Sequence, residues 1–433
     1  MTDLSFNALP LAQPATLEDS YGRFIPRQFQ QLLGRHSIHE VKLGDHVEQV
    51  MTLLFSDIRD FTTLSESILP AENFRFINSY LSTMEPVVGR HEGFIDKYIG
   101  DAIMALFATG ADHAVCCGID MLRQLVEYNR GRARAGYKPI RIGIGVNTGL
   151  VMLGTVGGHS RMDSTVIGDA VNQASRLESL TKVYRTPFLI SEHTLHALAD
   201  SAAYHIRFVD RQKIKGRYPA QSVYEIFDAD PEPLLLAKIE TRELFEEALA
   251  CYLMGNAGDA IPLLEQCGQI APDDLPARVY LDRCRMQQRS GELSFTLRKV
   301  EYEWFDYFAT GSEGTDSHHQ ELMLQIGDLG HAVESGRDTR PFTASLTENF
   351  VQHFRDEENL MRRYDYPFSA KHQYQHGVFM TSFSTLAARL DDRVGSTVRR
   401  LLDIQLHVAD RYVNHITKSD THLGHFLQRA GVS

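Results

Sequence analysis

Histidine and carboxylate side chains recur at helical spacing in the last third of the chain. His353 and Glu357 are four residues apart, and so are His372 and His376. Side chains four apart share one face of a helix, so two helices could each direct a pair of ligands to one place. Imidazoles mixed with carboxylates suit iron, and the lack of cysteine nearby argues against a structural zinc or iron–sulfur site. The spacing predicts a metal centre.

More candidate ligands flank these pairs. His415 stands five residues before Asp420 in "YVNHITKSD", and "DSHHQEL" opens an upstream helix with two adjacent histidines. More than half of the histidines lie after residue 293. This density distinguishes the segment from the rest of the chain.

Two acidic residues of the first half stand where strands end or turn. Asp57 lies in "FSDIRDFT" and Asp101 in "KYIGDAIMA". Carboxylates and backbone carbonyls suit Mg²⁺, which commonly joins protein carboxylates to substrate phosphates. Paired divalent ions can stabilise both oxygens exchanged in phosphoryl transfer. The alternative is that Asp101 is only the turn residue of a hairpin.

An amide and a guanidinium accompany these acids. Asn172 and Arg176 are four apart in "VIGDAVNQASRLES", on one face of an expected helix. Together they could orient a ribose and neutralise charge that builds on a phosphorus. The chain has no GxxxxGK[ST] motif, so a P-loop enzyme is excluded.

Alternating strand and helix patterns must position these residues. "VMTLLFSDIRDFT" predicts a strand, followed by a helix near 70–91. "FIDKYIGDAIMALF" predicts a hairpin that turns at Gly100-Asp101. A long helix is expected over about 111–135, and "IRIGIGVNTGLVMLGTVG" predicts another strand pair. With "PFLIS" and "SVYEIF" as closing strands, the pattern indicates an α+β or α/β domain.

The strand signals stop near residue 230, and helices follow. A helical hairpin plus a third helix loosely resembles one tetratricopeptide unit, which we interpret as a connector because such repeats need neighbours. The rest predicts an all-α four-helix bundle. The expected organisation is a leader with a short helix (1–44), a mixed domain (45–230), a helical connector (231–292) and the bundle (293–433).

Composition limits the function classes. The chain has 433 residues and a formal charge of −12, which argues against a nucleic-acid partner. Its five cysteines form no CxxC pair, and the N-terminus lacks a signal-peptide pattern. The longest apolar stretch is broken by glycines and too short to cross a bilayer. We expect a cytoplasmic protein without a membrane span.

The mixed domain resembles the catalytic domain of class III nucleotidyl cyclases. The resemblance rests on "MTLLFSDIRDFTTLSE", "ENFRFINSYL", "HEGFIDKYIGDAIMALF", "IRIGIGVNTGLVMLGTVG" and "RMDSTVIGDAVNQASRLESLTK", in this order. It implies a ferredoxin-like α+β fold and a homodimer with two active sites at the interface. It also implies that Asp57, Asp101 and the carbonyl of Ile58 hold two Mg²⁺ or Mn²⁺ ions, and that Asn172 and Arg176 stabilise the transition state.

The same resemblance implies which residues read the nucleotide. Lys97 and Thr165 match the base-reading positions. Adenine N1 accepts a hydrogen bond that a lysine can donate, whereas guanine carries donors there, so this pair favours ATP. A threonine at the second position resembles the bicarbonate-responsive subgroup. Lys215 and Arg217 in "KIKGRYP" are alternative phosphate-binding residues, and the sequence does not choose between them.

The bundle resembles the hemerythrin family, whose four helices hold a non-haem di-iron centre that binds O₂. "EENLM", the "YP" before the paired histidines, and "NHI" carry the resemblance. It implies seven ligands: His319, His353, Glu357, His372, His376, His415 and Asp420. His319 is preferred over His318 because it stands three residues before Leu322. One departure is that Arg411 and Tyr412 stand where the family often has tryptophan.

These resemblances predict an adenylate cyclase regulated by O₂, NO or iron redox state at the bundle. A first alternative is a bicarbonate-regulated cyclase whose bundle stores or delivers O₂ or iron. A guanylate cyclase is the nearest enzymatic alternative. A non-catalytic binding module is a further one, and the complete set of Asp57, Asp101, Asn172 and Arg176 argues against it.

Overall fold

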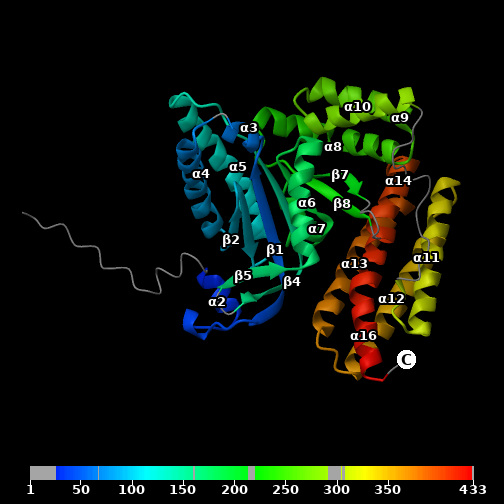
Figure 1. The fold of residues 1–433 in the computed structure, drawn as a ribbon. Coiled ribbons are helices and arrows are strands. Elements are labelled where there is room, and N and C mark those ends of the chain that lie inside the picture. The colour runs from blue at the N-terminus through cyan, green and yellow to red at the C-terminus, as the bar shows by residue number, and fades with distance from the viewer. Residues whose placement is uncertain are drawn as a thin grey trace, which may run out of the picture. The chain divides into compact units, whose positions relative to one another are not determined.

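The computed structural model describes residues 26–66, 68–158, 161–212, 220–290, 304 and 308–431. These residues form two compact units (Figure 1). The first runs to Thr181 and includes Pro187–Ala199, and the second holds Lys182–Thr186 and everything from Asp200 onward. Most of the expected leader lies outside the described residues. No helix among the described residues is long and apolar enough to cross a membrane.

The first unit is built on a mixed sheet. Its strands run in the order β2-β3-β1-β4-β6, and β5 pairs with β4. Only the β4–β6 pairing within this unit is parallel. Inward and outward positions alternate at the start of β1, and its second half is almost wholly buried. The strand bounds are β1 His46–Ile58, β2 Phe94–Ile99, β3 Ala102–Phe107, β4 Ile142–Gly158, β5 Arg161–Ile167 and β6 Phe188–Ser191.

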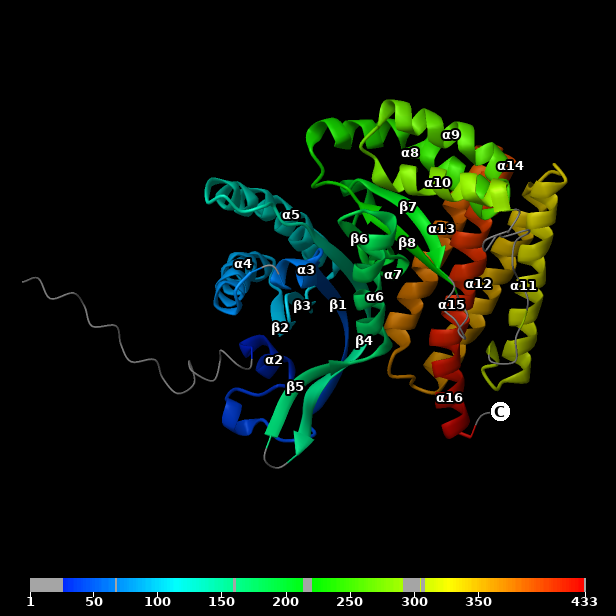
Figure 2. The ribbon, with the colours of Figure 1, turned by 45° about the horizontal axis from the view of Figure 1, so that its top comes forward.

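Helices α4 and α5 pack against each other and against the strands of this sheet, as Figures 1 and 2 show. Buried apolar residues of β1, β3 and β4 form the core with Phe29 and with the inner face of α6. The helix bounds in this unit are α2 Arg27–Leu32, η1 Ile38–Glu40, α3 Phe61–Glu66, α4 Pro70–Arg90, α5 Ala111–Arg134, α6 Asp169–Tyr184 and α7 Glu192–Ala197.

Most local predictions for this unit are confirmed, including the hairpin at Gly100-Asp101 and the long helix α5. The prediction of a strand pair in "IRIGIGVNTGLVMLGTVG" is wrong, because β4 is one continuous strand. Its Asn147, Thr148 and Gly149 stay in the ladder opposite Leu53, Thr52 and Met51 of β1. A long partner strand therefore keeps turn-forming residues extended.

The second unit begins with an antiparallel strand pair, β7 (Ile206–Gln212) and β8 (Gln221–Ile226), after the short helix η2 (Ser201–Ala203). Three connector helices follow, as expected: α8 (Glu232–Leu253), α9 (Ala257–Ile270) and α10 (Leu275–Ser290). Strand β7 has no counterpart in the sequence prediction.

A buried ion network fastens the strand pair to the connector. The guanidinium of Arg207 in β7 contacts the carboxylates of Glu225 at 2.6 Å and Asp274 at 2.7 Å. Lys238 of α8 contacts Glu225 at 2.8 Å and Asp230 at 2.6 Å. A buried charge that loses its partner is strongly destabilising, so this network holds β7 and β8 firmly against the helices.

The rest of the unit is the expected four-helix bundle, with a core that includes Phe350, Phe379, Phe383 and Tyr412. Figures 1 and 2 show its helices side by side. The predicted fold class, an α+β domain followed by helices, is confirmed. The first three helices are α11 Glu313–Glu334, α12 Arg340–Arg363 and α13 Ser369–Asp391. The fourth combines α14 Thr397–Ile404, α15 Asp410–His415 and α16 Thr421–Arg429 with π-helical segments η4 Gln405–Ala409 and η5 Ile416–Asp420.

Candidate active site and metal centre

Asp57 and Asp101 meet at one end of the first unit's sheet. Asp57 is the penultimate residue of β1, and Asp101 lies in the β2–β3 turn behind Gly100, whose φ of 67° suits glycine. Pairing of Ser56 with Ile103 brings the strand end beside this turn. The backbone N–H of Ile58 donates to Asp101 Oδ2 at 3.2 Å. Residues 44 positions apart thus share one site.

The donor set of this site fits a divalent cation. Burial, together with the hydrogen bond and negative charge of Asp57, raises the pKa of Asp101 to about 7. Two carboxylates that repel each other in a half-buried place are stabilised by a shared cation. Carboxylate oxygens are also the ligands that Mg²⁺ prefers. Asp57 and Asp101 therefore suit Mg²⁺ or Mn²⁺.

Lys97 and Thr165 are also brought together. Lys97 lies in β2 and Thr165 in β5, and the lysine Nζ donates to Thr165 Oγ1 at 3.2 Å. The carboxylate of the buried Asp96 lies 3.3 Å from the same Nζ. An ammonium held this way keeps one donor available for a ligand, since lysine offers three.

Asn172 and Arg176 lie one turn apart on α6, and both are exposed. Among the described residues, neither side chain hydrogen-bonds or forms an ion pair with another part of the chain, including Asp57 and Asp101. Within one chain, the side chains of Asn172 and Arg176 therefore make no polar contact with the carboxylates of Asp57 and Asp101. Lys215 and Arg217 fall outside the described residues.

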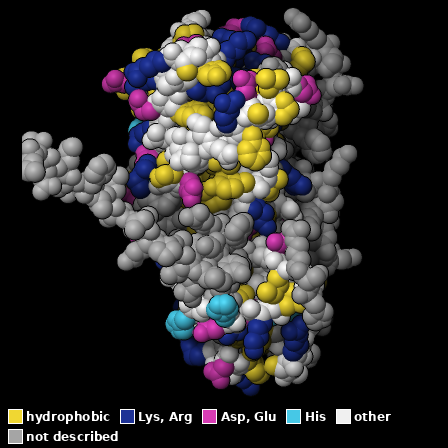
Figure 3. All heavy atoms as spheres, turned by 60° about the vertical axis from the view of Figure 1, so that its left-hand side comes forward, with side chains coloured by type: hydrophobic (Ala, Val, Ile, Leu, Met, Phe, Trp, Pro, Cys, Tyr) yellow, Lys and Arg dark blue, Asp and Glu magenta, His cyan; other side chains and the backbone are white. Residues whose placement is uncertain are grey.

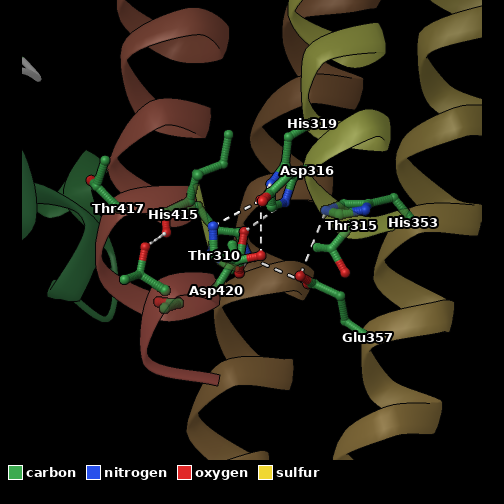
Figure 4. A network of polar contacts seen from close by, with 12 residues as sticks. Thr310, Thr315, Asp316, His319, His353, Glu357, His415, Thr417 and Asp420 are labelled. Carbon is green, nitrogen blue, oxygen red and sulfur yellow. Dashed lines mark hydrogen bonds and ion pairs between the residues drawn. The ribbon is translucent and has the colours of Figure 1, made fainter. Parts of the chain in front are cut away.

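The candidate iron ligands converge inside the bundle in two overlapping groups. Glu357 belongs to both groups, and all seven residues are buried (Figure 4 shows several of them). Ligand atoms within each group lie within 4.8 Å of one another. The first group is Glu357, His372, His376 and His415, and the second is His319, His353, Glu357 and Asp420.

The two carboxylates lie between the imidazoles. Asp420 Oδ1 is 3.0 Å from Nε2 of both His372 and His415, and Asp420 Oδ2 is 3.2 Å from His319 Nε2. Glu357 Oε2 is 3.2 Å from His376 Nε2, and its Oε1 is 3.8 Å from His353 Nε2. Each carboxylate thus faces both groups, as bridging ligands of a two-metal centre would.

Unsatisfied polar atoms support metal binding here. Both Glu357 oxygens and His353 Nε2 are buried without a hydrogen-bond partner among the described residues. Burial lowers the pKa of His353 to about 4, which leaves the neutral imidazole that metals require. Burial also lowers the pKa of His415, but Asp420 and Glu357 outweigh it and raise that pKa to about 10. The same negative field favours a metal cation.

A further carboxylate orients one of the imidazoles, and the sequence prediction missed it. Glu358 Oε1 lies 2.9 Å from His376 Nδ1, within hydrogen-bond distance, whereas Asp316 Oδ1 lies 3.9 Å from His319 Nδ1, which has no hydrogen-bond partner among the described residues. Asp316 itself accepts hydrogen bonds from the N–H and hydroxyl of Thr310 at 2.8 Å. A carboxylate at hydrogen-bond distance from a ring nitrogen, as Glu358 is from His376, fixes ring orientation at metal sites. Glu358 directly follows the candidate ligand Glu357, which is the only sequence signal for Glu358.

Local helix geometry explains the unusual spacing of His415 and Asp420. In a regular α-helix, at about 100° per residue, residues five apart point about 140° away from each other. Here η5 separates them, and the N–H of Thr421 bonds to the carbonyl of Ile416, five residues back. This wider turn brings both side chains to the same side.

The adjacent histidines of the first bundle helix differ in burial. His319 is buried among the other ligands, whereas His318 is exposed. The structure thus places His319 and not His318 in the group that could hold a metal ion.

Comparisons with known proteins match the two parts of the chain that hold the candidate sites to two different families. Residues 27–227 match the adenylate and guanylate cyclase catalytic domain family, and residues 310–427 match the hemerythrin HHE cation-binding domain family. The first segment is thus similar to the cyclase family and the second to the hemerythrin family.

Named relatives align with much of the chain. It is 35% identical over 295 residues to the "Adenylate cyclase, terminal-differentiation specific" of Dictyostelium discoideum, which covers 67% of this chain and 14% of that protein. It is 44% identical over 229 residues to the adenylate cyclase of Anabaena cylindrica, covering 52% and 45% respectively. The chain therefore spans less than half the length of either relative.

A solved structure is also similar. The adenylyl cyclase CyaB from P. aeruginosa is 33% identical, with a TM-score of 0.38 over 42% of this chain and 96% of that chain. At that TM-score, the family assignment rests on the sequence matches.

Proposed function

We propose that this protein is an adenylate cyclase that converts ATP to 3′,5′-cyclic AMP and pyrophosphate. The observation that carries the proposal is the meeting of Asp57 and Asp101 within a cyclase-family domain. The relatives from Dictyostelium discoideum and Anabaena cylindrica, both named adenylate cyclases, support the choice of reaction.

The ribose 3′ hydroxyl attacks the α-phosphorus, and pyrophosphate leaves. Asp57, Asp101 and the carbonyl oxygen of Ile58 would hold two Mg²⁺ or Mn²⁺ ions, which when bound lower the pKa of the hydroxyl and stabilise the leaving oxygen. The amide of Asn172 orients the ribose. The guanidinium of Arg176 neutralises negative charge that develops around the phosphorus.

A homodimer explains why Asn172 and Arg176 make no contact with the acids of their own chain. In a dimer with its sites at the interface, they would act beside the metal site of the partner. The first unit exposes Leu150 and Met152 of β4 and Ile167 of β5. Exposed hydrophobic side chains, of which Figure 3 shows several on one face, are typical of interaction surfaces.

The contact between Lys97 and Thr165 favours adenine. Thr165 accepts one hydrogen bond from the ammonium, so the lysine can donate another to adenine N1. Guanine carries an N–H donor at this position, which would face the Lys97 ammonium, itself a donor. Leaving a buried donor unpaired costs about 1–3 kcal/mol. ATP is therefore the proposed substrate, and GTP the alternative. ATP as substrate and free cysteine thiols fit the cytoplasmic location that we propose.

The seven buried ligands of the bundle would hold a non-haem di-iron centre. Five imidazoles and two bridging carboxylates suit iron, and the hemerythrin match supports this choice. When bound, the iron pair would supply a site for a diatomic molecule, O₂ or NO, or for a change of redox state. The chain's own residues fix the geometry and exclude water from it.

Regulation of the cyclase by this centre is supported by contacts of the ligand-bearing helix. Arg211 of β7 donates to both carboxylate oxygens of Asp410, at 2.5 and 2.7 Å, and both side chains are buried. Asp410 lies between η4 and η5, five residues before His415. In the same helical run, Arg399 contacts Glu246 of α8 at 3.0 Å. A shift of this helix would therefore move both β7 and the connector.

Strand β7 in turn touches the helix that carries the proposed catalytic pair. Asp210, next to Arg211, accepts a hydrogen bond from the hydroxyl of Tyr184. Tyr184 is the last residue of α6, and its ring stacks on Tyr280 of α10 at a centroid distance of 6.3 Å. This chain of contacts leads from the iron-ligand helix to the helix of Asn172 and Arg176. We propose it as the physical basis of regulation.

The deciding experiment measures cyclic AMP formation from ATP and Mg²⁺ by the iron-loaded protein. The di-ferrous form without air is compared with the same sample after air is admitted, while the absorption of the iron is followed. A rate that changes with the absorption supports a redox- or O₂-regulated cyclase. A steady rate through a clear iron transition contradicts regulation. The bundle would then store or deliver O₂ or iron, and the dependence on bicarbonate would be measured next.

A further inference from the structure

Tyr412 carries a buried hydroxyl group and is not one of the seven candidate iron ligands. The side chain is fully buried in the bundle core, where its ring contacts Phe350 at 5.1 Å and Phe379 at 6.0 Å between centroids. Its hydroxyl has no hydrogen-bond partner among the described residues. Leaving a hydroxyl unpaired in such a place costs about 1–3 kcal/mol. An apolar phenylalanine would fill the same space without that cost.

The ring of Tyr412 lies against one half of the metal centre. It contacts His319 at 5.9 Å and His353 at 6.1 Å between ring centroids. The rings of His372, His376 and His415 contact one another and not Tyr412. The phenol therefore sits beside the group that offers two imidazoles and not beside the group that offers three.

This difference in ligand number matters for small molecules. With the two carboxylates shared, a metal beside His319 and His353 has one protein nitrogen fewer than its neighbour. An open position on a metal is where an external ligand binds. The position next to the two-histidine group is therefore the one that an exogenous ligand would take, and Tyr412 lies on that side.

We propose that the Tyr412 hydroxyl donates a hydrogen bond to a small anionic or diatomic ligand held at the two-histidine side of the centre. This inference rests on the proposed di-iron function. A phenol is protonated at neutral pH and is thus a donor. The phenylalanine rings around it keep water away, which strengthens a hydrogen bond compared with one in water. Tyr412 would set how tightly the ligand is held, and the imidazoles and carboxylates would hold the metals.

The test uses the full-length, iron-loaded protein with azide as the probe. Iron per chain is measured first in the wild type and in Tyr412→Phe. Azide is then titrated against the oxidised protein by absorption, and its infrared stretch is recorded in H₂O and D₂O. The substitution is expected to weaken azide binding about tenfold, as loss of a hydrogen bond to a charged group does. It should also abolish the D₂O shift of the azide band.

Tyr366→Phe is the matched control. The Tyr366 ring lies 6.3 Å from that of His372, but its hydroxyl already contacts His422 Nδ1 at 2.7 Å. This variant should keep both the azide affinity and the D₂O shift. Equal azide affinity and an unchanged D₂O shift in Tyr412→Phe would overturn the inference. A wild-type protein that retains no iron would instead overturn the proposed di-iron function, so the two failures are distinguishable.

Discussion

The guanidinium of Arg211 donates two hydrogen bonds to the carboxylate of Asp410, a residue 199 positions further along the chain. Arg211 lies in the segment that matches the cyclase family, and Asp410 in the segment that matches hemerythrin. Gln405 adds a third hydrogen bond to Asp410 at 2.8 Å. The segments that match the two families are therefore joined, within one structural unit, by a buried ion pair with two hydrogen bonds.

Removing this ion pair should make the rate of cyclic AMP formation independent of the state of the iron centre. Arg211→Leu alone leaves the Asp410 carboxylate buried with the hydrogen bond from Gln405 but without its cationic partner, and is expected to cost about 3–5 kcal/mol of unfolding free energy. The double variant Arg211→Leu/Asp410→Leu should recover much of that loss. Both should keep their iron, yet lose the difference in cyclic AMP rate between the di-ferrous and air-exposed forms. Unfolding is measured by denaturant titration.

Arg285→Leu provides the control for that experiment. Arg285 pairs with Glu265 at 2.7 Å, but both side chains are 46% exposed. Exposed pairs contribute at most about 1 kcal/mol, so stability and regulation should both be unchanged. A double variant that keeps the wild-type rate difference would show that the coupling does not pass through Arg211 and Asp410.

Asp101→Asn should nearly abolish cyclic AMP formation. The substitution removes one of two carboxylates that would hold the catalytic cations, and we expect a loss of at least about 100-fold in kcat. The asparagine also removes the repulsion with Asp57, so the fold should not be weakened. Asp60→Asn is the control, because the Asp60 side chain forms an ion pair with Arg141 in which both side chains are exposed. Comparable activity of the two variants would contradict the metal-binding role of Asp101.

Lys97→Glu should change the choice of nucleotide. The carboxylate would accept hydrogen bonds from guanine and repel adenine N1, so the preference for ATP over GTP should fall by about tenfold or more. The measurement is competition between ATP and GTP in one assay. A wild-type enzyme that prefers GTP would contradict the adenine-reading role of Lys97 and Thr165.

His319→Ala and His318→Ala should differ in metal content. The buried His319 belongs to the two-histidine group, so its loss should lower iron from about two towards one per chain. The exposed His318 should be dispensable. Iron is measured by elemental analysis after dialysis, with melting temperature recorded in parallel. Equal iron loss in both variants would contradict the assignment.

Acid should destabilise the second unit through Glu225. Burial raises the pKa of this carboxyl, but the charges of Arg207 and Lys238 outweigh it and lower the pKa to about 2. A lowered folded-state pKa stabilises the protein above the unfolded value of about 4.5, and that stability disappears as pH falls towards 2. The contribution is on the order of 3 kcal/mol. Glu225→Gln, compared with wild type in metal-free protein, should flatten the pH dependence of unfolding over this range.

Local patterns determined much of this protein. The spacing of apolar residues predicted the helices α4, α5 and α8–α10 and the hairpin that carries Asp101, because periodicity and turn residues act over short distances. Motif order named both families, and the matches confirm them. The roles of the individual site residues stay predictions, although the structure brings the candidate iron ligands into two groups.

Tertiary structure decided what local patterns do not encode. Pairing with β1 keeps the glycine-rich β4 as one strand, and the π-helical turn at η5 aligns His415 with Asp420. The bond between Arg211 and Asp410 depends on residues that are distant in sequence and ordinary in type. Burial and pairing of such side chains arise only when separate elements pack, so their partners cannot be determined from spacing along the chain.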